Sequence, residues 1–259
     1  MSQPSLASRA WPGACLLSLT LIAWQATGEP AGAIAYGGWT GGVSLDTYYN
    51  DSRSGTLMPM AALPATSEDV GLNAGLNLGQ VFVLTPEIDT WVIASVHGRA
   101  GALLPAASAL WGSLYANTIW HLDAQRETYV LLGSTQFFST GSYQAFEGGY
   151  VQSCWPGARA RLQVGAGQFV SLASPSNGFT MPSLGGGIDQ SLGPSTVLSA
   201  RYAYQSLLYA QRVEPRQQGY VMLSHRLESG WEAHLQLMRS WLPDTGSEGY
   251  LATGLGYDF

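Results

Sequence analysis

From about residue 37 onward, apolar and polar residues alternate along the chain with a period of two. The clearest run, Val70 to Leu78, places Val, Leu and Ala on one face and Gly and Asn on the other. The segments 158–166 and 231–237 alternate in the same way. Successive side chains of a strand point to opposite faces, whereas a helix would spread these residues around its circumference. The pattern therefore predicts β-strands with one apolar and one polar face.

Twelve such segments follow one another, an even number, and each can supply the ~9–11 residues of a tilted membrane strand. Short turns at 155–158, 193–196 and 228–230 alternate with longer polar connections at 50–67, 171–180, 207–219 and 242–248. A long inner connection at 80–90 and a short outer link at 139–141 depart from this rule. We predict an all-β fold, a transmembrane antiparallel up-and-down β-barrel of about twelve strands. The expected strands are 37–48, 68–79, 90–101, 112–123, 127–138, 142–154, 158–169, 181–192, 195–206, 218–227, 230–241 and 249–259.

Residues 1–28 have the organisation of a cleaved signal peptide. Arg9 and the amino terminus supply positive charge, and the apolar run 14–24 follows. At ~11 residues this run matches a signal-peptide core and is too short to span a bilayer. Small residues allow cleavage at 28 or as late as 33, which leaves a barrel domain over 34–259. An uncleaved amino-terminal anchor helix is the alternative.

The composition separates a membrane barrel from a soluble β-sandwich, which would also alternate. Only 11% of residues are charged and there is no lysine, against roughly 25% charged residues in soluble domains. A sandwich exposes one face of each strand to water and usually needs more charge, so the composition favours the barrel. The net charge of −6 gives no basic surface for nucleic acid. Cys154 alone follows the leader and the four histidines lack metal-ligand spacing, so we expect no disulfide, metal or cofactor.

Aromatic residues gather near the ends of the expected strands, as in the interfacial girdles of membrane barrels. We expect the outer girdle to contain Tyr48, Tyr49, Trp111 and Trp241, and the inner girdle to contain Trp120, Trp155, Trp231 and Tyr257.

The last segment of the chain alternates up to its final residue. Leu255, Tyr257 and Phe259 share one face with Leu251 and Thr253. A final strand that ends in Phe resembles the carboxyl-terminal signature of Gram-negative outer-membrane barrel proteins. In that class the signature is recognised by the barrel-assembly machinery, so the resemblance implies this partner and an outer-membrane location.

The parity of the hairpins predicts which charged residues share the lumen. If the leucines around the turn at 228–230 face lipid, Arg226 lies opposite Glu232 and Ser224 lies opposite His234. The hairpin around Pro194 likewise turns Asp189 and Arg201 inward. Arg159 and Arg161 join them from the preceding hairpin, and the sequence identifies no acidic partner for these two. The predicted belt in the periplasmic half of the lumen contains Arg159, Arg161, Arg201, Arg226, Asp189 and Glu232, with His234 beside it.

Two interpretations of this belt stay open. A ring of arginines would favour anionic solutes, because fixed positive charge lowers their barrier. The same residues could instead be ion pairs that fill a narrow lumen. Ser224 and His234 also allow a hydrolase interpretation, which needs a third orienting group and oxyanion donors; Glu232 lies two residues away and is expected to engage Arg226.

The leading prediction is a porin-like channel for passive diffusion of small polar solutes, a class that includes anions, without enzymatic activity. The expected partners are outer-membrane lipid, the assembly machinery and the solutes, whereas the oligomeric state is left open. An outer-membrane lipid hydrolase and a non-conducting accessory barrel, plugged by the apolar segment 102–111, are the alternatives.

Overall fold

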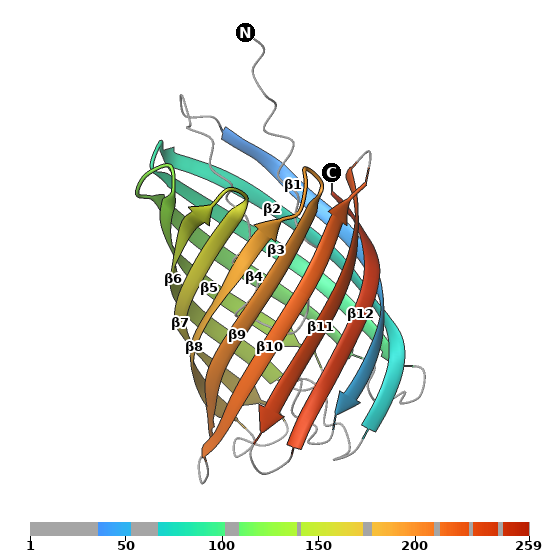
Figure 1. Cartoon of the computed structure of the whole chain (residues 1–259). Helices are drawn as coiled ribbons and strands as arrows, with labels where there is room; N and C mark the ends of the chain where they lie inside the picture. Colours follow the sequence, from blue (N-terminus) through green and yellow to red (C-terminus); the bar gives the residue numbers. More distant parts are fainter. Residues whose placement is uncertain are drawn as a thin grey trace.

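The computed structural model describes residues 36–52, 67–101, 109–138, 141–172, 178–209, 213–227, 230–242 and 246–258. These residues form twelve antiparallel strands in one closed barrel (Figure 1). Each strand pairs with its sequence neighbours, and the last strand pairs with the first, so the up-and-down prediction is confirmed. Among the described residues, no helix is long and apolar enough to cross a membrane.

The strands are 12 to 19 residues long. Their bounds are β1 Tyr36–Ser52, β2 Ser67–Thr85, β3 Ile88–Gly101, β4 Ala109–His121, β5 Arg126–Phe137, β6 Gly141–Trp155, β7 Ala158–Ser171, β8 Phe179–Ser191, β9 Thr196–Leu208, β10 Val213–Arg226, β11 Trp231–Leu242 and β12 Gly246–Asp258.

The outer surface of the barrel is apolar. Leu72, Leu76, Leu162, Leu184 and Leu235 are each about half exposed or more, and their sequence neighbours on either side point the other way. Water-soluble proteins bury such residues, whereas a membrane barrel presents them to lipid. The alternation in the sequence therefore has its physical cause in a bilayer outside and a polar lumen inside.

Several strands extend beyond the ranges that their sequences predicted, and β2 and β10 show the physical reasons. β2 continues to Thr85, so the inner connection is the tight turn at 86–87 and not the long loop expected at 80–90. The alternation was blurred there because 81–84 is apolar on both faces. β10 begins at Val213, not at 218, because Glu214 and Arg216 face the lumen although the segment, with its Pro, has the composition of a loop.

The short turns lie at the end of the barrel where β1 begins and β12 ends (Figure 1). At one of them, Gly230 has a φ of +86°, a left-handed conformation that favours glycine. At another, the guanidinium of Arg126 and the N–H of Gln125 donate hydrogen bonds to Asp123 and lower the pKa of its carboxyl group. Of the expected assembly signal, Leu255 faces outward, and Phe259 lies outside the described residues. The leader, and residues 102–108 of the expected plug, also lie outside them.

Candidate functional site: the lumen wall

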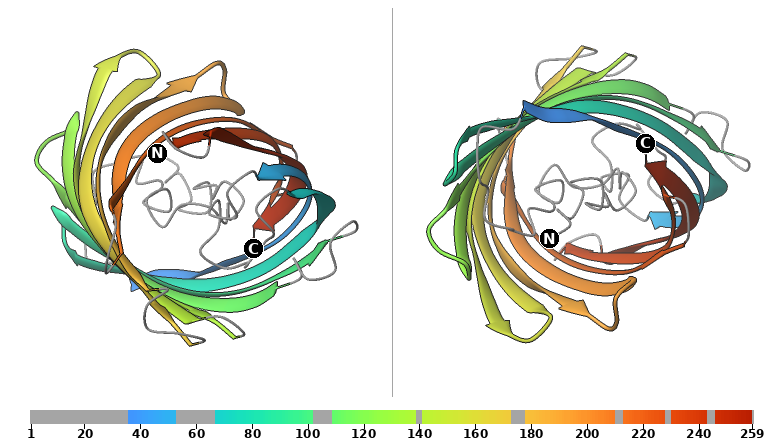
Figure 2. Two further views of the ribbon diagram at one scale, coloured as in Figure 1. Left: turned by 90° about the horizontal axis from the view of Figure 1, so that it is seen from below. Right: turned by 90° about the horizontal axis from the view of Figure 1, so that it is seen from above.

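The inner face of the barrel is lined by polar and charged side chains that are buried. Viewed along the barrel axis, the strands form one closed ring (Figure 2). Asn73, Gln163, Gln218 and Gln236 each expose 7% or less of their surface, while the residues beside them face outward. Three of these side chains donate hydrogen bonds to other strands, Asn73 to Tyr250, Gln163 to Glu147 and Gln218 to Ser240. The side chain of Gln236 has no hydrogen-bond partner within the described wall.

The structure reproduces the predicted registers of the charged hairpins. Arg226 pairs with Glu232 and Ser224 with His234 across β10 and β11. Asp189 and Arg201 lie diagonally across β8 and β9, with 2.7 Å between Asp189 Oδ1 and Arg201 Nη2. These positions agree with the sequence analysis, whereas the role of the residues in selectivity stays a prediction.

Arg159 has an acidic partner that the sequence did not identify. Its Nη2 donates a hydrogen bond to Glu127 Oε2, at 2.5 Å. Glu127 also contacts His121, whose Nε2 lies 3.0 Å from Asp89 Oδ2. Glu127 comes from β5, two strands away from β7, and hairpin parity relates only strands joined by the same turn. The Arg159–Glu127 pair is therefore not visible in the pattern of any one hairpin.

Arg161 is placed differently from Arg159. Its guanidinium carbon lies 5.3 Å from the centre of the Tyr129 ring, over the face of the ring. The Tyr129 hydroxyl donates to Glu147 Oε1 at 2.8 Å, and Gln163 donates to the other oxygen. Tyr129 crosses the wall above Gly149, where a Cβ atom would come within 2.4 Å of the ring. Glycine at 149 therefore positions this aromatic surface.

Carboxylates outnumber arginines on the described part of the lumen wall, contrary to the predicted belt of four arginines and two acids. Nine acidic side chains and six arginines point into the lumen. Three of the predicted arginines have a carboxylate beside them: Arg159 and Arg201 form ion pairs, and Arg226 lies opposite Glu232 in the neighbouring strand. The residues are Asp46, Asp89, Glu127, Glu147, Asp189, Glu214, Glu232, Glu248 and Asp258, against Arg99, Arg159, Arg161, Arg201, Arg216 and Arg226.

His234 has a carboxylate partner that the sequence analysis missed. Its Nε2 lies 2.9 Å from Asp46 Oδ1, and both side chains are almost fully buried. Asp46 comes from β1 and reaches His234 across Gly254 of β12, so Asp46 and not Glu232 is the acidic neighbour of the imidazole. Closure between the first and last strands brings the pair together, a contact that no local pattern reveals.

Ser224, His234 and Asp46 are the residue types of a nucleophilic triad, but the geometry is incomplete. Such a triad needs the serine within hydrogen-bond reach of the base. Within the described barrel, no hydrogen bond joins Ser224 to either imidazole nitrogen of His234, and the carboxylate of Asp46 lies beside Nε2. The described residues also contain no group of His, Cys, Asp and Glu that could hold a metal ion.

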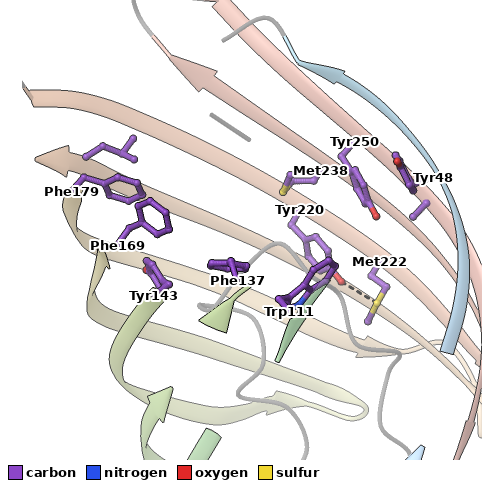
Figure 3. Packing of buried hydrophobic residues seen from close by; sticks show 12 residues of the cluster. Tyr48, Trp111, Phe137, Tyr143, Phe169, Phe179, Tyr220, Met222, Met238 and Tyr250 are labelled. Atoms are coloured by element: carbon purple, nitrogen blue, oxygen red, sulfur yellow. Dashed lines mark hydrogen bonds between the residues drawn. The ribbon is translucent and has the colours of Figure 1, made fainter. Parts of the chain in front are cut away.

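Aromatic residues and methionines line much of the outer half of the lumen. Figure 3 shows these side chains following the wall from Phe179 to Tyr48. Phe169 and Phe179 stack with ring centres 5.5 Å apart, and Tyr48 and Tyr250 with centres 6.1 Å apart. The outer-girdle prediction is therefore wrong for Tyr48 and Trp111, which are buried inside, whereas Tyr49 and Trp241 face outward.

The sequence contained a signal for these inner aromatics. In β4, Trp111 and Tyr115 alternate with Leu110 and Leu114, so apolarity alone does not tell the inner face from the outer one. Asn117 shares the face of the two aromatics and would have placed them inside. The distance of an aromatic residue from the strand end therefore predicts its orientation less well than the polar residues on the same strand face do.

No protein-family model and no curated protein sequence matches this chain at a significant level. Solved structures do match it. An outer-membrane channel from Pseudomonas putida F1 superposes with a TM-score of 0.63 at 12% identity, over 88% of this chain and 97% of the other. An anion-selective porin from Comamonas acidovorans gives 0.51 at 10% identity, over 86% and 99%. The translocator domain of the autotransporter NalP from Neisseria meningitidis gives 0.53 at 10% identity, over 85% and 88%.

The fold is that of bacterial outer-membrane β-barrels. The three structures share it at 12% identity or less, and their described roles differ. Because one fold hosts several functions, the side chains of the lumen and not the fold determine the function.

Proposed function

We propose that this protein is a passive channel of the outer membrane for small solutes. The observation that carries the proposal is the contrast between the two faces of the barrel, with leucines outside and a buried polar network inside. A polar lumen wall within an apolar shell is typical of barrels that conduct water-soluble molecules. The resemblance in fold to outer-membrane channels supports the same conclusion.

The solutes that fit this wall best are polar or amphipathic and carry at most a small net charge. The ion pairs Arg159–Glu127 and Arg201–Asp189 place opposite charges side by side, so the lumen offers both donors and acceptors. A ring of unpaired arginines would select anions strongly, whereas alternating charges select weakly. The basic groups that an anion would meet include Arg161 and Arg201, which lie on either side of Gly187 in the wall.

The proposal is tested by reconstituting the mature barrel into a planar bilayer and recording single-channel currents in KCl. Discrete conductance steps are expected, with a reversal potential that indicates weak cation preference in a tenfold salt gradient, because carboxylates outnumber arginines on the described wall. Stable insertion without conductance would contradict the proposal and favour a non-conducting accessory barrel.

A further inference from the structure

Arg161 and Arg201 converge on one point of the lumen wall. In the β-ladder, Arg161 pairs with Gly187 and Gly187 pairs with Arg201, so the two arginines flank a glycine at the same level. A Cβ atom at Gly187 would lie 2.7 Å from Arg201 Cδ and 3.0 Å from Nη1. The Arg201 side chain therefore crosses the glycine toward Arg161, and any larger residue at 187 would prevent this.

The Nη1 group of Arg201 is a buried donor without a hydrogen-bond partner in the described structure. Its side chain is only 6% exposed, and its contact with Asp189 uses the other nitrogen, Nη2. A buried guanidinium nitrogen without an acceptor costs free energy, which an anion that accepts its hydrogen bond would recover. Arg161 lies close enough to Arg201 to repel it electrostatically, and an anion bound between the two would relieve this repulsion as well.

The carboxylates near this point are already engaged. Glu147 accepts hydrogen bonds from Tyr129 and Gln163, and Asp189 is held by Arg201. These two carboxylates balance the charges of the two guanidinium groups, so the local net charge is zero. A single carboxylate ligand therefore fits the site better than a phosphate or another multiply charged anion.

Apolar surfaces border the two arginines on both sides. Arg201 pairs directly with Tyr220, which in turn pairs with Met238, and the Tyr220 hydroxyl lies 3.0 Å from Met222 Sδ. On the other side, the Tyr129 ring lies beneath Arg161. The point where an anion can bind is therefore framed by two tyrosine rings and two methionines, surfaces suited to an aromatic ring.

We propose that Arg161 and Arg201, together with Tyr129 and Tyr220, form a binding site for small aromatic carboxylates inside the lumen. The carboxylate accepts hydrogen bonds from the two guanidinium groups, and the ring packs on the tyrosine and methionine side chains. The site deepens the proposed channel function, on which it rests, by naming the solute class that the lumen holds.

The test is isothermal titration calorimetry of the folded barrel in detergent with benzoate, acetate and benzyl alcohol. Benzoate contains both the carboxylate and the aromatic ring, whereas acetate contains only the carboxylate and benzyl alcohol only the ring. We expect benzoate to bind at least about tenfold more tightly than either, because a hydrogen bond to a charged group and the burial of a ring each contribute about this factor or more. Equal binding of benzoate and acetate, or of benzoate and benzyl alcohol, would overturn the proposal, and this comparison needs no variant.

Substitution then locates the site. Arg201→Gln is expected to weaken benzoate binding about tenfold or more. Arg216→Gln is the matched control, since Arg216 is an equally buried lumen arginine that lies 4.0 Å from Glu248 and donates to Ser240. Circular dichroism and heat-modifiable electrophoretic mobility establish that each variant is folded. Unchanged affinity in folded Arg201→Gln, or equal loss in both variants, would contradict the assignment.

Conductance separates this proposal from the one on which it rests. A barrel that conducts KCl but does not bind benzoate is a channel without the site. A barrel that binds benzoate but conducts no ions retains the site and contradicts the channel function.

Discussion

Asp46 can reach His234 because Gly254, which lies between them, has no side chain. The Oδ1 atom of Asp46 occupies the place that a Cβ atom at Gly254 would take, with only 2.0 Å between the two positions. Gly256, two residues further along the same face of β12, has its nearest neighbour at 3.6 Å, an ordinary contact. The two glycines therefore face the same lumen but differ in how much room they leave.

Gly254→Ala is expected to lower the free energy of unfolding by about 1–3 kcal/mol, the usual cost of overpacking, because Asp46 must move away from His234. Gly256→Ala is the control and should leave stability nearly unchanged. Urea unfolding of the barrel in lipid vesicles, followed by tryptophan fluorescence, measures both. Equal stability of the two variants would show that Asp46 is not confined by Gly254.

At the level of strands, the outer face of β11 shows how depth in the bilayer sets the cost of a charge. Leu235 lies within β11, and Leu227 lies at the turn that precedes this strand. Leu235→Arg is expected to destabilise the barrel by about 2–4 kcal/mol, and Leu227→Arg by about 0–1 kcal/mol, because the second site lies near the interface. The same unfolding experiment compares them, and similar losses at both positions would contradict this placement of the membrane.

The turn between β10 and β11 depends on a left-handed glycine. Gly230→Ala should cost about 1–2 kcal/mol, since φ is +86° and the new Cβ would lie 2.8 Å from the Asp258 carbonyl oxygen. Gly193→Ala is the matched change in the turn between β8 and β9, where a Cβ atom would meet nothing within 4 Å. It should be close to neutral, and a loss at Gly193 as large as at Gly230 would show that backbone conformation is not the cause.

Strands could be predicted from this sequence more reliably than the contacts of their side chains. Alternation places Leu235 outside and Arg226 opposite Glu232, because both follow from parity within one hairpin. The contacts of Arg159 with Glu127 and of His234 with Asp46 join strands that are not connected by a turn. They depend on the curvature and closure of the whole barrel, which a local pattern does not encode.

For the molecule as a whole, the balance of charge in the lumen decides which ions pass. The Arg159–Glu127 pair allows this balance to be shifted in both directions at one place, since the two side chains are in direct contact. Arg159→Gln removes one positive charge beside Glu127 and should move the reversal potential in a KCl gradient toward cation selectivity, whereas Glu127→Gln should move it toward anion selectivity. Single-channel recordings of the two variants and of the double variant test this, and the double variant should return close to the original value. A shift in the same direction for both single variants would mean that the pair acts through the width of the lumen and not through its charge.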